Sequence, residues 1–219
     1  MNYKDITVGI VSFKSEKVIF DCLKSIKSIK KIIIFDNSYD IETKKKVANI
    51  YPNIKFILSK KNLGYGEANN KIIKSCKTEY LFILNPDTIL QPNCEMQLLK
   101  SINELKLNFS IIAPISNKKD FGNFDNSKVI FTKKLIKVDF VKGYAMLLNV
   151  KKIKKLGMFD KNIFLYLEEI DLCKRIKERN QKIFVNKEAK IIHLEAKSTD
   201  IKFEFENTIN EIDKQFGVI

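Results

Sequence analysis

The fold class follows from residues 6–36, which read ITVGIVSFKSEKVIFDCLKSIKSIKKIIIFD. Residues 6–13 are apolar and rich in β-branched side chains, which is typical of a buried strand. From Glu16 to Ile29 the apolar residues recur at helical spacing, and 31–36 is a second apolar run. A strand, a helix and another strand in this order predict a right-handed crossover between parallel strands.

The rest of the chain extends this pattern and then loosens it. Further elements are predicted as helices over about 42–50, 67–76 and 92–106, and as strands over 54–59, 80–85 and 110–114. The second half is less regular, with an extended or hairpin region over 127–141, a strand over 141–149, a helix from about Glu168, short strands over 182–186 and 189–194, and a C-terminal amphipathic helix over 201–219. We therefore predict an α/β fold with a mostly parallel central sheet flanked by helices and a smaller mixed sheet in the second half.

The length of 219 residues and the lack of repeats or Pro/Gly-rich linkers predict a single domain. A hydrophobic fraction of 45% excludes disorder as the main state. Apolar stretches such as YLFIL, 80–84, are far too short to cross a bilayer. The N-terminus has no pattern of a secretory signal, so we expect a cytoplasmic protein.

The charge balance is strongly basic: 40 lysines and arginines against 26 acidic residues give a net charge of +14. This favours anionic partners such as nucleic acid, anionic lipid or phosphate-bearing small molecules. Only Arg175 and Arg179 are arginines, however, and the lysines are spread along the whole chain. Readers of nucleic acid draw mainly on arginine, so we favour a solvated lysine surface and expect no nucleic-acid partner.

The four cysteines form no Cys-x-x-Cys pair, so we expect them to be reduced and mostly in the core. They are Cys22, Cys76, Cys94 and Cys173. Together with the lone His193 they lack the spacing of a zinc site. Any metal should therefore be a hard cation held by carboxylates, with His193 as a candidate ligand or, by default, a structural histidine.

Polar residues follow three of the predicted strands, where ligands bind in open α/β sheets. They are Ser12-Phe13-Lys14, Asp36-Asn37-Ser38 and Asn85-Pro86-Asp87. There is no Gly-x-Gly-x-x-Gly after the first strand and no P-loop, which argues against a dinucleotide cofactor. Because Asp also caps turns, structural and functional interpretations of Asp36 stand about even, whereas function is favoured for Asp87.

Three acidic residues, Glu168, Glu169 and Asp171, begin the helix that follows IFLYL. Asp171 is explained by an ion pair with Arg175 four residues on. Two successive glutamates point in different directions from a helix, so one of them is a candidate general base in a cleft.

At this point the chain resembles the family-2 inverting glycosyltransferases of the GT-A fold, especially their bacterial rhamnosyltransferase-like branch. The resemblance covers about residues 6–198 and rests on seven segments in the order of the family. These are VSFKS, IIIFDNSYD, NLGYGEANN, YLFILNPDT, VKGYAMLLN, LGMFDKNIFLYLEEIDLCKRI and IIHLEAKS.

The resemblance implies a donor site in residues 1–113 for a dTDP- or UDP-linked sugar. Its nucleotide-binding residues would be Ser12 and Phe13 against the base, Asp36 on the edge of the base, and Asn62, Gly64 and Asn85 around the nucleotide. Asp87 would hold Mn²⁺ or Mg²⁺ on the donor diphosphate, with His193 completing the metal shell.

The resemblance also implies an acceptor and catalytic half over 114–200. Gly143, Tyr144 and Glu168 would bind a glycan or lipid-linked acceptor, and Glu169 would be the catalytic base. Glu169 stands where the family usually has Asp, and Asn85 replaces the first acid of Asp-x-Asp. Peripheral contact with the inner face of the membrane is a further expectation, since the chain is basic.

Three alternatives remain open on the sequence. The chain could be a lysine-rich nucleic-acid-binding α/β protein, although its aromatic residues sit mostly inside apolar runs. A sugar nucleotidyltransferase is disfavoured, because SFKSEK lacks the glycine- and arginine-containing loop of that class. The third alternative is a catalytically inactive family member that acts as a binding subunit.

Overall fold

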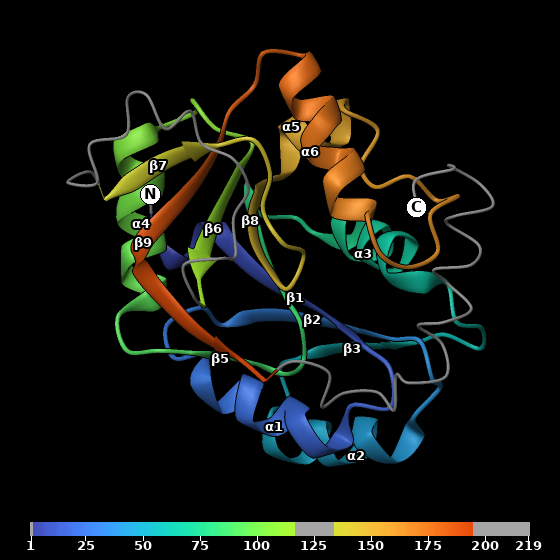
Figure 1. Ribbon diagram of the computed structural model, residues 1–219. Coiled ribbons are helices and arrows are strands. Elements are labelled where there is room, and N and C mark those ends of the chain that lie inside the picture. Colours follow the sequence, from blue (N-terminus) through green and yellow to red (C-terminus); the bar gives the residue numbers. More distant parts are fainter. Residues whose placement is uncertain (1, 117–133, 195–219) are drawn as a thin grey trace.

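A nine-stranded sheet with helices on both faces makes up the computed structural model, which describes residues 2–116 and 134–194 (Figure 1). The strands are β1 (Ile6–Ser12), β2 (Lys31–Asp36), β3 (Lys55–Leu58), β4 (Tyr80–Leu84), β5 (Thr88–Leu90), β6 (Ile111–Ile115), β7 (Leu135–Val138), β8 (Ala145–Asn149) and β9 (Ile183–His193). The helices are α1 (Glu16–Ser25), α2 (Ile41–Ile50), α3 (Gly64–Ser75), α4 (Cys94–Leu105), α5 (Val150–Lys155) and α6 (Glu168–Glu178), and a 3₁₀ turn covers Tyr3–Asp5.

The sheet has the strand order β3-β2-β1-β4-β8-β6-β9-β5, with β7 beside β9. The four strands of the first half pair in parallel, as the strand–helix alternation predicts. From β8 onwards parallel and antiparallel pairs mix, and these strands continue the same sheet. The predicted α/β fold class is confirmed, but the smaller mixed sheet predicted for the second half is part of this one sheet, because β8 pairs with β4.

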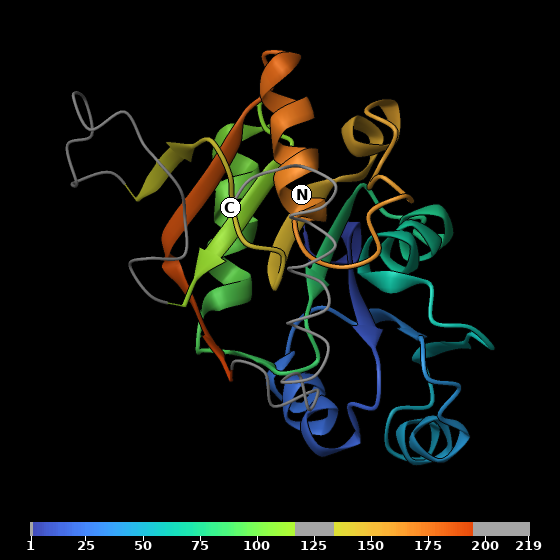
Figure 2. The same ribbon diagram turned by 45° about the vertical axis from the view of Figure 1, so that its right-hand side comes forward.

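Apolar side chains cover both faces of this sheet, as expected for parallel strands buried under helices. One face packs against α1, α2 and α4, with Ile10, Leu23 and Phe82 fully buried among them. The other face packs against α3, α5 and α6 and buries Ile72 and Ile176. Figure 2 shows the two helix layers on opposite sides of the sheet. None of the helices in the described ranges is long and apolar enough to span a membrane.

The structure differs from the sequence prediction in three places. The two short strands predicted over 182–186 and 189–194 are one long strand, β9. The polar interruption at Asn186 is accommodated, because its amide oxygen accepts the N–H groups of Glu188 and Ala189. The strand predicted from residue 141 begins at Ala145, and β5 and α5 are new. Elements of three and six residues are too short to show a periodicity.

Two predicted elements lie partly or wholly outside the described residues. Of the extended region over 127–141, the part that is described contains β7, antiparallel to β9. The C-terminal helix over 201–219 lies outside the described residues. All four cysteines are free and buried, which confirms the prediction for them.

Candidate active site

The carboxyl ends of β1 and β2 bring two of the predicted nucleotide-binding residues side by side. Ser12 pairs in register with Asp36, and the N–H of Asn37 donates to the Ser12 carbonyl at 2.8 Å. The Ser12 hydroxyl is buried without a hydrogen-bond partner. Phe13 lies beside it, with the Lys14 ammonium 5.4 Å from its ring centre. The register of two parallel strands thus places hydroxyl, carboxylate and aromatic groups at one edge.

Asp36 is fully buried and serves a turn as well as the edge of the sheet. Its Oδ1 accepts the N–H groups of Ser38 and Asp40 at 3.0 and 2.9 Å, and the Ser38 hydroxyl contacts both carboxylate oxygens. The structural interpretation of Asp36 is therefore correct. Since Oδ2 accepts only one hydrogen bond, from the Ser38 hydroxyl, it retains acceptor capacity for a ligand.

Asn37 joins this edge to the turn that precedes α3. Its side-chain amide donates to the Gly64 carbonyl at 3.1 Å and accepts the Leu63 N–H at 3.2 Å. Asn62 is exposed, and its side chain accepts the N–H of Gly64 at 3.0 Å within the same turn. Asn37 belongs to the polar residues predicted at the end of the second strand, but its role in holding the turn before α3 could not be predicted from its position in the sequence.

Gly64 is required by a close approach of the backbone. Its φ is +75°, and a Cβ added there would lie 2.1 Å from the Phe164 carbonyl oxygen. The same carbonyl accepts the N–H of Tyr65 at 3.0 Å. Only glycine combines a left-handed conformation with this contact, so the turn at 62–64 and the segment before α6 are held together.

Asp87 and His193 meet at the predicted metal position. Asp87 is 2% exposed, and its Oδ1 makes no hydrogen bond and lies 3.4 Å from Nε2 of His193. Pairing of β5 with β9 causes this approach, since Thr88 is opposite His193 and the Leu194 N–H donates to the Asp87 carbonyl. Two residues from opposite halves of the chain are thereby brought together, as the resemblance implied.

Tyr144 and Asn85 surround this pair. The Tyr144 ring is buried and stacks on His193 with ring centres 4.5 Å apart. This stacking restricts the orientation of the imidazole. The backbone N–H of Asn85 donates to the Tyr144 carbonyl at 2.8 Å. The side-chain oxygen of Asn85 is buried without a hydrogen-bond partner. Buried oxygens without partners are rare, and those of Asn85 and Asp87 are available to a bound group.

The donor atoms fit a divalent cation that is shared with a substrate. Within residues 2–116 and 134–194 no three His, Cys, Asp or Glu residues are grouped to hold a metal. Asp87 and His193 offer one buried oxygen and one nitrogen. Mg²⁺ and Mn²⁺ commonly take a few protein ligands and complete their shells with water and substrate phosphates. The residues present therefore fit such an ion.

The two glutamates at the start of α6 occupy different environments. Glu168 is 4% exposed, and burial, followed by the charge of Glu169, raises its pKa to about 8. Burial also raises the pKa of Glu169, but the backbone amides of Glu169 and Gly143 and the charge of Lys142 oppose the rise. Near neutral pH Glu168 is thus mainly protonated, whereas Glu169 has partners that favour its carboxylate.

Tyr65 is influenced by both the acid pair of α6 and Asp87. Its hydroxyl donates to the Gly143 carbonyl at 2.6 Å. Burial chiefly, with the charges of Glu168, Glu169 and Asp87, raises its pKa well above the ordinary value. A Cβ added at Gly143 would lie 3.6 Å from both the Tyr65 ring and the Glu169 carboxyl carbon. The charges of three carboxyl groups, from α6 and from the end of β4, therefore act on one tyrosine. Tyr65 was missed because a tyrosine at helical spacing usually belongs to the core.

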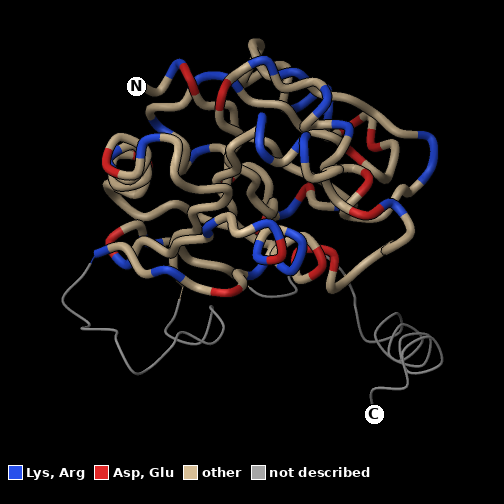
Figure 3. Tube along the Cα trace, turned by 90° about the horizontal axis from the view of Figure 1, so that it is seen from above, with Lys and Arg blue, Asp and Glu red and all other residues tan. Residues whose placement is uncertain are grey.

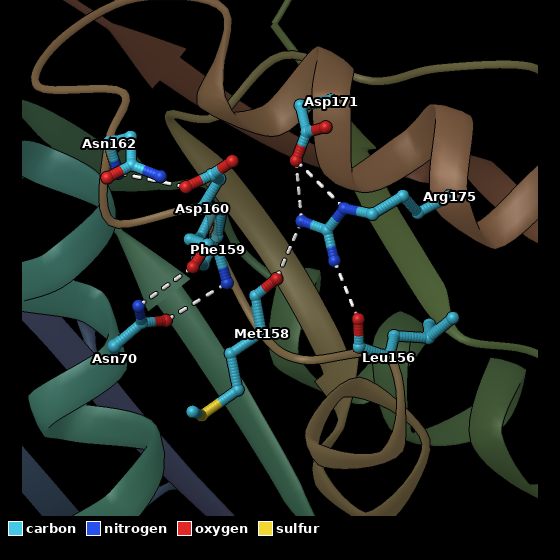
Figure 4. Close-up of polar contacts among 8 residues, drawn as sticks. All are labelled: Asn70, Leu156, Met158, Phe159, Asp160, Asn162, Asp171 and Arg175. Carbon is cyan, nitrogen blue, oxygen red and sulfur yellow. Dashed lines mark hydrogen bonds and ion pairs between the residues drawn. The ribbon is translucent and has the colours of Figure 1, made fainter.

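The segment 156–167, which we call the strap, leads into α6 and is held along its length (Figure 4). Arg175 donates to the carbonyls of Leu156 and Met158 at 2.8 and 2.7 Å, and it pairs with Asp171 at 2.6 Å. The predicted Asp171–Arg175 pair is thereby confirmed. Asn70 of α3 exchanges two hydrogen bonds of 3.0 Å with the backbone of Phe159. These contacts determine where the strap delivers Glu168 and Glu169.

Two cavities in the described part of the protein are not lined by any of the predicted site residues. One cavity, of about 690 Å³, lies between α1, β5 and the start of α4. The other, of about 400 Å³, lies between α3 and the strap beside Arg175. The candidate site is instead defined by the contacts that join the strand ends, the turn at 62–64, Tyr65 and the start of α6.

Solved glycosyltransferase structures share this architecture. A mannosyltransferase from Pyrobaculum calidifontis, solved with GDP-Man and Mn²⁺, aligns with a TM-score of 0.73 at 13% identity over 95% of this chain and 62% of that one. GalNAc-T7 with UDP, GalNAc and Mn²⁺ aligns with a TM-score of 0.72 at 13% identity, covering 86% and 43%. TarS (1–349) of S. aureus aligns at 0.63 and 14% identity, covering 85% and 60%. At these identities the likeness shows the fold, which is of the GT-A type.

Sequence comparison goes further. The low-salt glycan biosynthesis hexosyltransferase Agl10 of Haloferax volcanii is 26% identical over 196 residues. That alignment covers 80% of this chain, which spans 62% of the length of Agl10. The sequence pattern of glycosyl transferase family 2 matches residues 7–171, from β1 through the acid pair of α6. The chain therefore belongs to glycosyl transferase family 2.

Proposed function

We propose that this protein transfers a sugar from a nucleoside diphosphate to a hydroxyl group of an acceptor, with inversion at the sugar carbon. One observation carries the proposal: the unpartnered oxygen of Asp87 lies 3.4 Å from His193, and the charges of Asp87 and of the Glu168–Glu169 pair all raise the pKa of Tyr65. A cation position near one buried and one half-buried acid suits a reaction that stabilises a leaving diphosphate and deprotonates an alcohol.

The donor nucleotide lies at the ends of β1, β2 and β4 in this proposal. Support comes from the unpartnered hydroxyl of Ser12 and the remaining acceptor capacity of Asp36. The full set of nucleotide contacts is Ser12, Phe13, Asp36, Asn62, Gly64 and Asn85. The donor is a UDP- or dTDP-linked sugar, of rhamnose or a similar bacterial type, bound by residues 1–113.

Asp87 and His193 hold Mn²⁺ or Mg²⁺, in keeping with the Mn²⁺ present in two of the related structures. When bound, the ion offsets the negative charge that develops on the diphosphate as the sugar departs. The stacked Tyr144 ring keeps the His193 imidazole turned towards Asp87. Such an orienting contact supports the geometry of a metal ligand.

Glu169 is the base that takes the proton of the acceptor hydroxyl. Its backbone-amide partners favour the charged form, and Gly143 leaves space against its carboxyl group. Glu168, protonated beside it, adds no second negative charge near neutral pH. One base without an enzyme nucleophile gives a single displacement and hence inversion. The acceptor is a glycan or lipid-linked molecule, bound in the half over 114–200 beside Gly143, Tyr144 and Glu168.

A thermal-shift screen of UDP, dTDP and GDP with and without Mn²⁺ tests the proposal. We expect UDP or dTDP to raise the melting temperature only when Mn²⁺ is present, because ligands stabilise the state to which they bind. The Asp87→Asn variant should lose this dependence. If no nucleoside diphosphate raises the melting temperature under either condition, the proposed donor class is wrong.

A further inference from the structure

Exposed apolar side chains gather around the candidate active site. In the parts of the chain that the structure describes, the exposed large apolar residues are Tyr39, Ile41, Ile50, Leu107, Phe164, Leu167 and Ile192. Tyr39 and Ile41 follow the Asp36 turn, while Phe164 and Leu167 directly precede Glu168. Single exposed apolar residues need no explanation, but a group of them beside a site marks an interaction surface.

These four residues belong to one connected rim, which we define as segments 37–41 and 164–167. The side-chain amide of Asn37 donates a hydrogen bond to the Gly64 carbonyl. The backbone N–H of Tyr65, which follows Gly64, donates to the Phe164 carbonyl. The turn before α3 therefore bridges the two segments. The rim is continuous with the place where the acceptor would enter, because Leu167 is followed at once by Glu168 and Glu169.

The exposure of Phe164 and Leu167 is built into the fold. Phe164 is 55% exposed and Leu167 47% exposed, although the strap is fixed by Arg175, Asn70 and the Tyr65 N–H. Tyr166 and Leu167 both have left-handed backbones, with φ of 65° and 67°. Two successive non-glycine residues in this conformation are strained, and strain of this kind is retained mostly at functional sites.

The lysines around the rim indicate which kind of partner binds there. Exposed lysines stand beside both segments, at Lys14 next to the Ser38 turn, Lys60 and Lys61 before the Gly64 turn, and Lys161 in the strap. Lysines are also spread over the rest of the described trace (Figure 3), and the whole chain carries +14. Apolar side chains combined with lysines form the two signals that hold a protein on an anionic bilayer.

We propose that this rim docks on the surface of an anionic lipid bilayer, with Phe164 and Leu167 entering the interface beside the active site. Docking in this orientation turns the Glu168–Glu169 end of α6 towards the membrane. The acceptor hydroxyl would then be presented by a lipid-linked molecule. This last step rests on the proposed function, whereas the docking itself does not.

Vesicle binding by the full chain tests the rim. Binding is measured by co-sedimentation with vesicles of phosphatidylcholine alone and of phosphatidylcholine with phosphatidylglycerol. We expect the wild type to bind the anionic vesicles, and F164S/L167N to bind roughly tenfold more weakly through loss of apolar burial. Asn suits the left-handed backbone at 167. The matched control is I50S/L107S, which changes residues 60% and 58% exposed outside the rim and should bind like the wild type.

The same proteins are screened with UDP and Mn²⁺, so that docking and donor binding are scored separately. Loss of vesicle binding in F164S/L167N with an unchanged nucleotide response supports docking. Vesicle binding without any nucleotide response also supports docking, but overturns the proposed function. Docking is overturned if the wild type binds neither kind of vesicle, if both double variants bind alike, or if F164S/L167N instead dissociates a dimer in sedimentation equilibrium.

Discussion

Nε2 of His193 lies 3.4 Å from Oδ1 of Asp87, an oxygen that is buried and makes no hydrogen bond. The contact exists because β5 and β9 pair antiparallel across the two halves of the chain. At 3.4 Å the two atoms are close but do not form a short hydrogen bond, so both are available to a common ligand.

Removing the charge of Asp87 should weaken metal-dependent nucleotide binding. In Asp87→Asn we expect the affinity for UDP in the presence of Mn²⁺ to fall at least about tenfold, measured by calorimetric titration. The control Asp21→Asn neutralises an exposed acid on α1 and should behave as the wild type. Equal UDP affinity in wild type and Asp87→Asn, with and without Mn²⁺, would contradict a metal role for Asp87.

Glu169→Gln removes the proposed base without changing the shape of the side chain. Turnover should fall by about two to four orders of magnitude, while donor-nucleotide affinity stays near normal. Sugar transfer and UDP binding are measured on the same preparation. Glu178→Gln, at the exposed far end of the same helix, serves as the control. Normal turnover in Glu169→Gln would show that the base lies elsewhere.

Burial of Glu168 should make the stability of the fold depend on pH. Its pKa of about 8 in the fold lies above the ordinary glutamate value of 4.5, so the native state favours the protonated form. The stabilisation is complete below pH 4.5 and is lost as the pH rises through 8. Across this window the free energy of unfolding of the wild type should fall by an amount on the order of a few kcal/mol. Glu168→Gln should lack this fall, because it has no carboxyl group to titrate. Urea unfolding measures the change at pH 6 and pH 9, which lie on the order of one to two units below and above the pKa of Glu168 in the fold. Identical pH dependence in wild type and variant would refute the assignment.

Alanine substitutions at Gly157 and Gly64 distinguish the cost of a left-handed backbone from the cost of a steric clash. A Cβ at Gly157, where φ is +92°, meets nothing within 4 Å, so Gly157→Ala should cost only about 1 kcal/mol of unfolding free energy. Gly64→Ala also forces a Cβ against the Phe164 carbonyl and should cost more than about 3 kcal/mol. Because the strap would shift with that carbonyl, turnover should fall in Gly64→Ala alone. Equal losses of stability in the two variants would show that the close contact is relieved without cost.

Much of the first half could be predicted from local pattern. Residues 6–13 and 31–36 are apolar runs that cannot be exposed, and each is followed by a polar strand end. The ordinary ambiguity at a strand end remained for Asp36, whose carboxylate does serve the turn through Ser38 and Asp40. Short elements such as β5 could not be predicted, because three residues show no period and β5 exists only through its pairing with β9.

The sequence by itself determined the alternation of strands and helices, the family, and the chemical types available at the strand ends, because these depend on composition and spacing along the chain. Tertiary structure alone decided that Asp87 faces His193, that the charges of Asp87 and of the acid pair of α6 act on the same tyrosine, and that the Phe164 carbonyl lies against Gly64. It also separated the two glutamates, since desolvation depends on what packs around a carboxyl group and not on its neighbours in sequence.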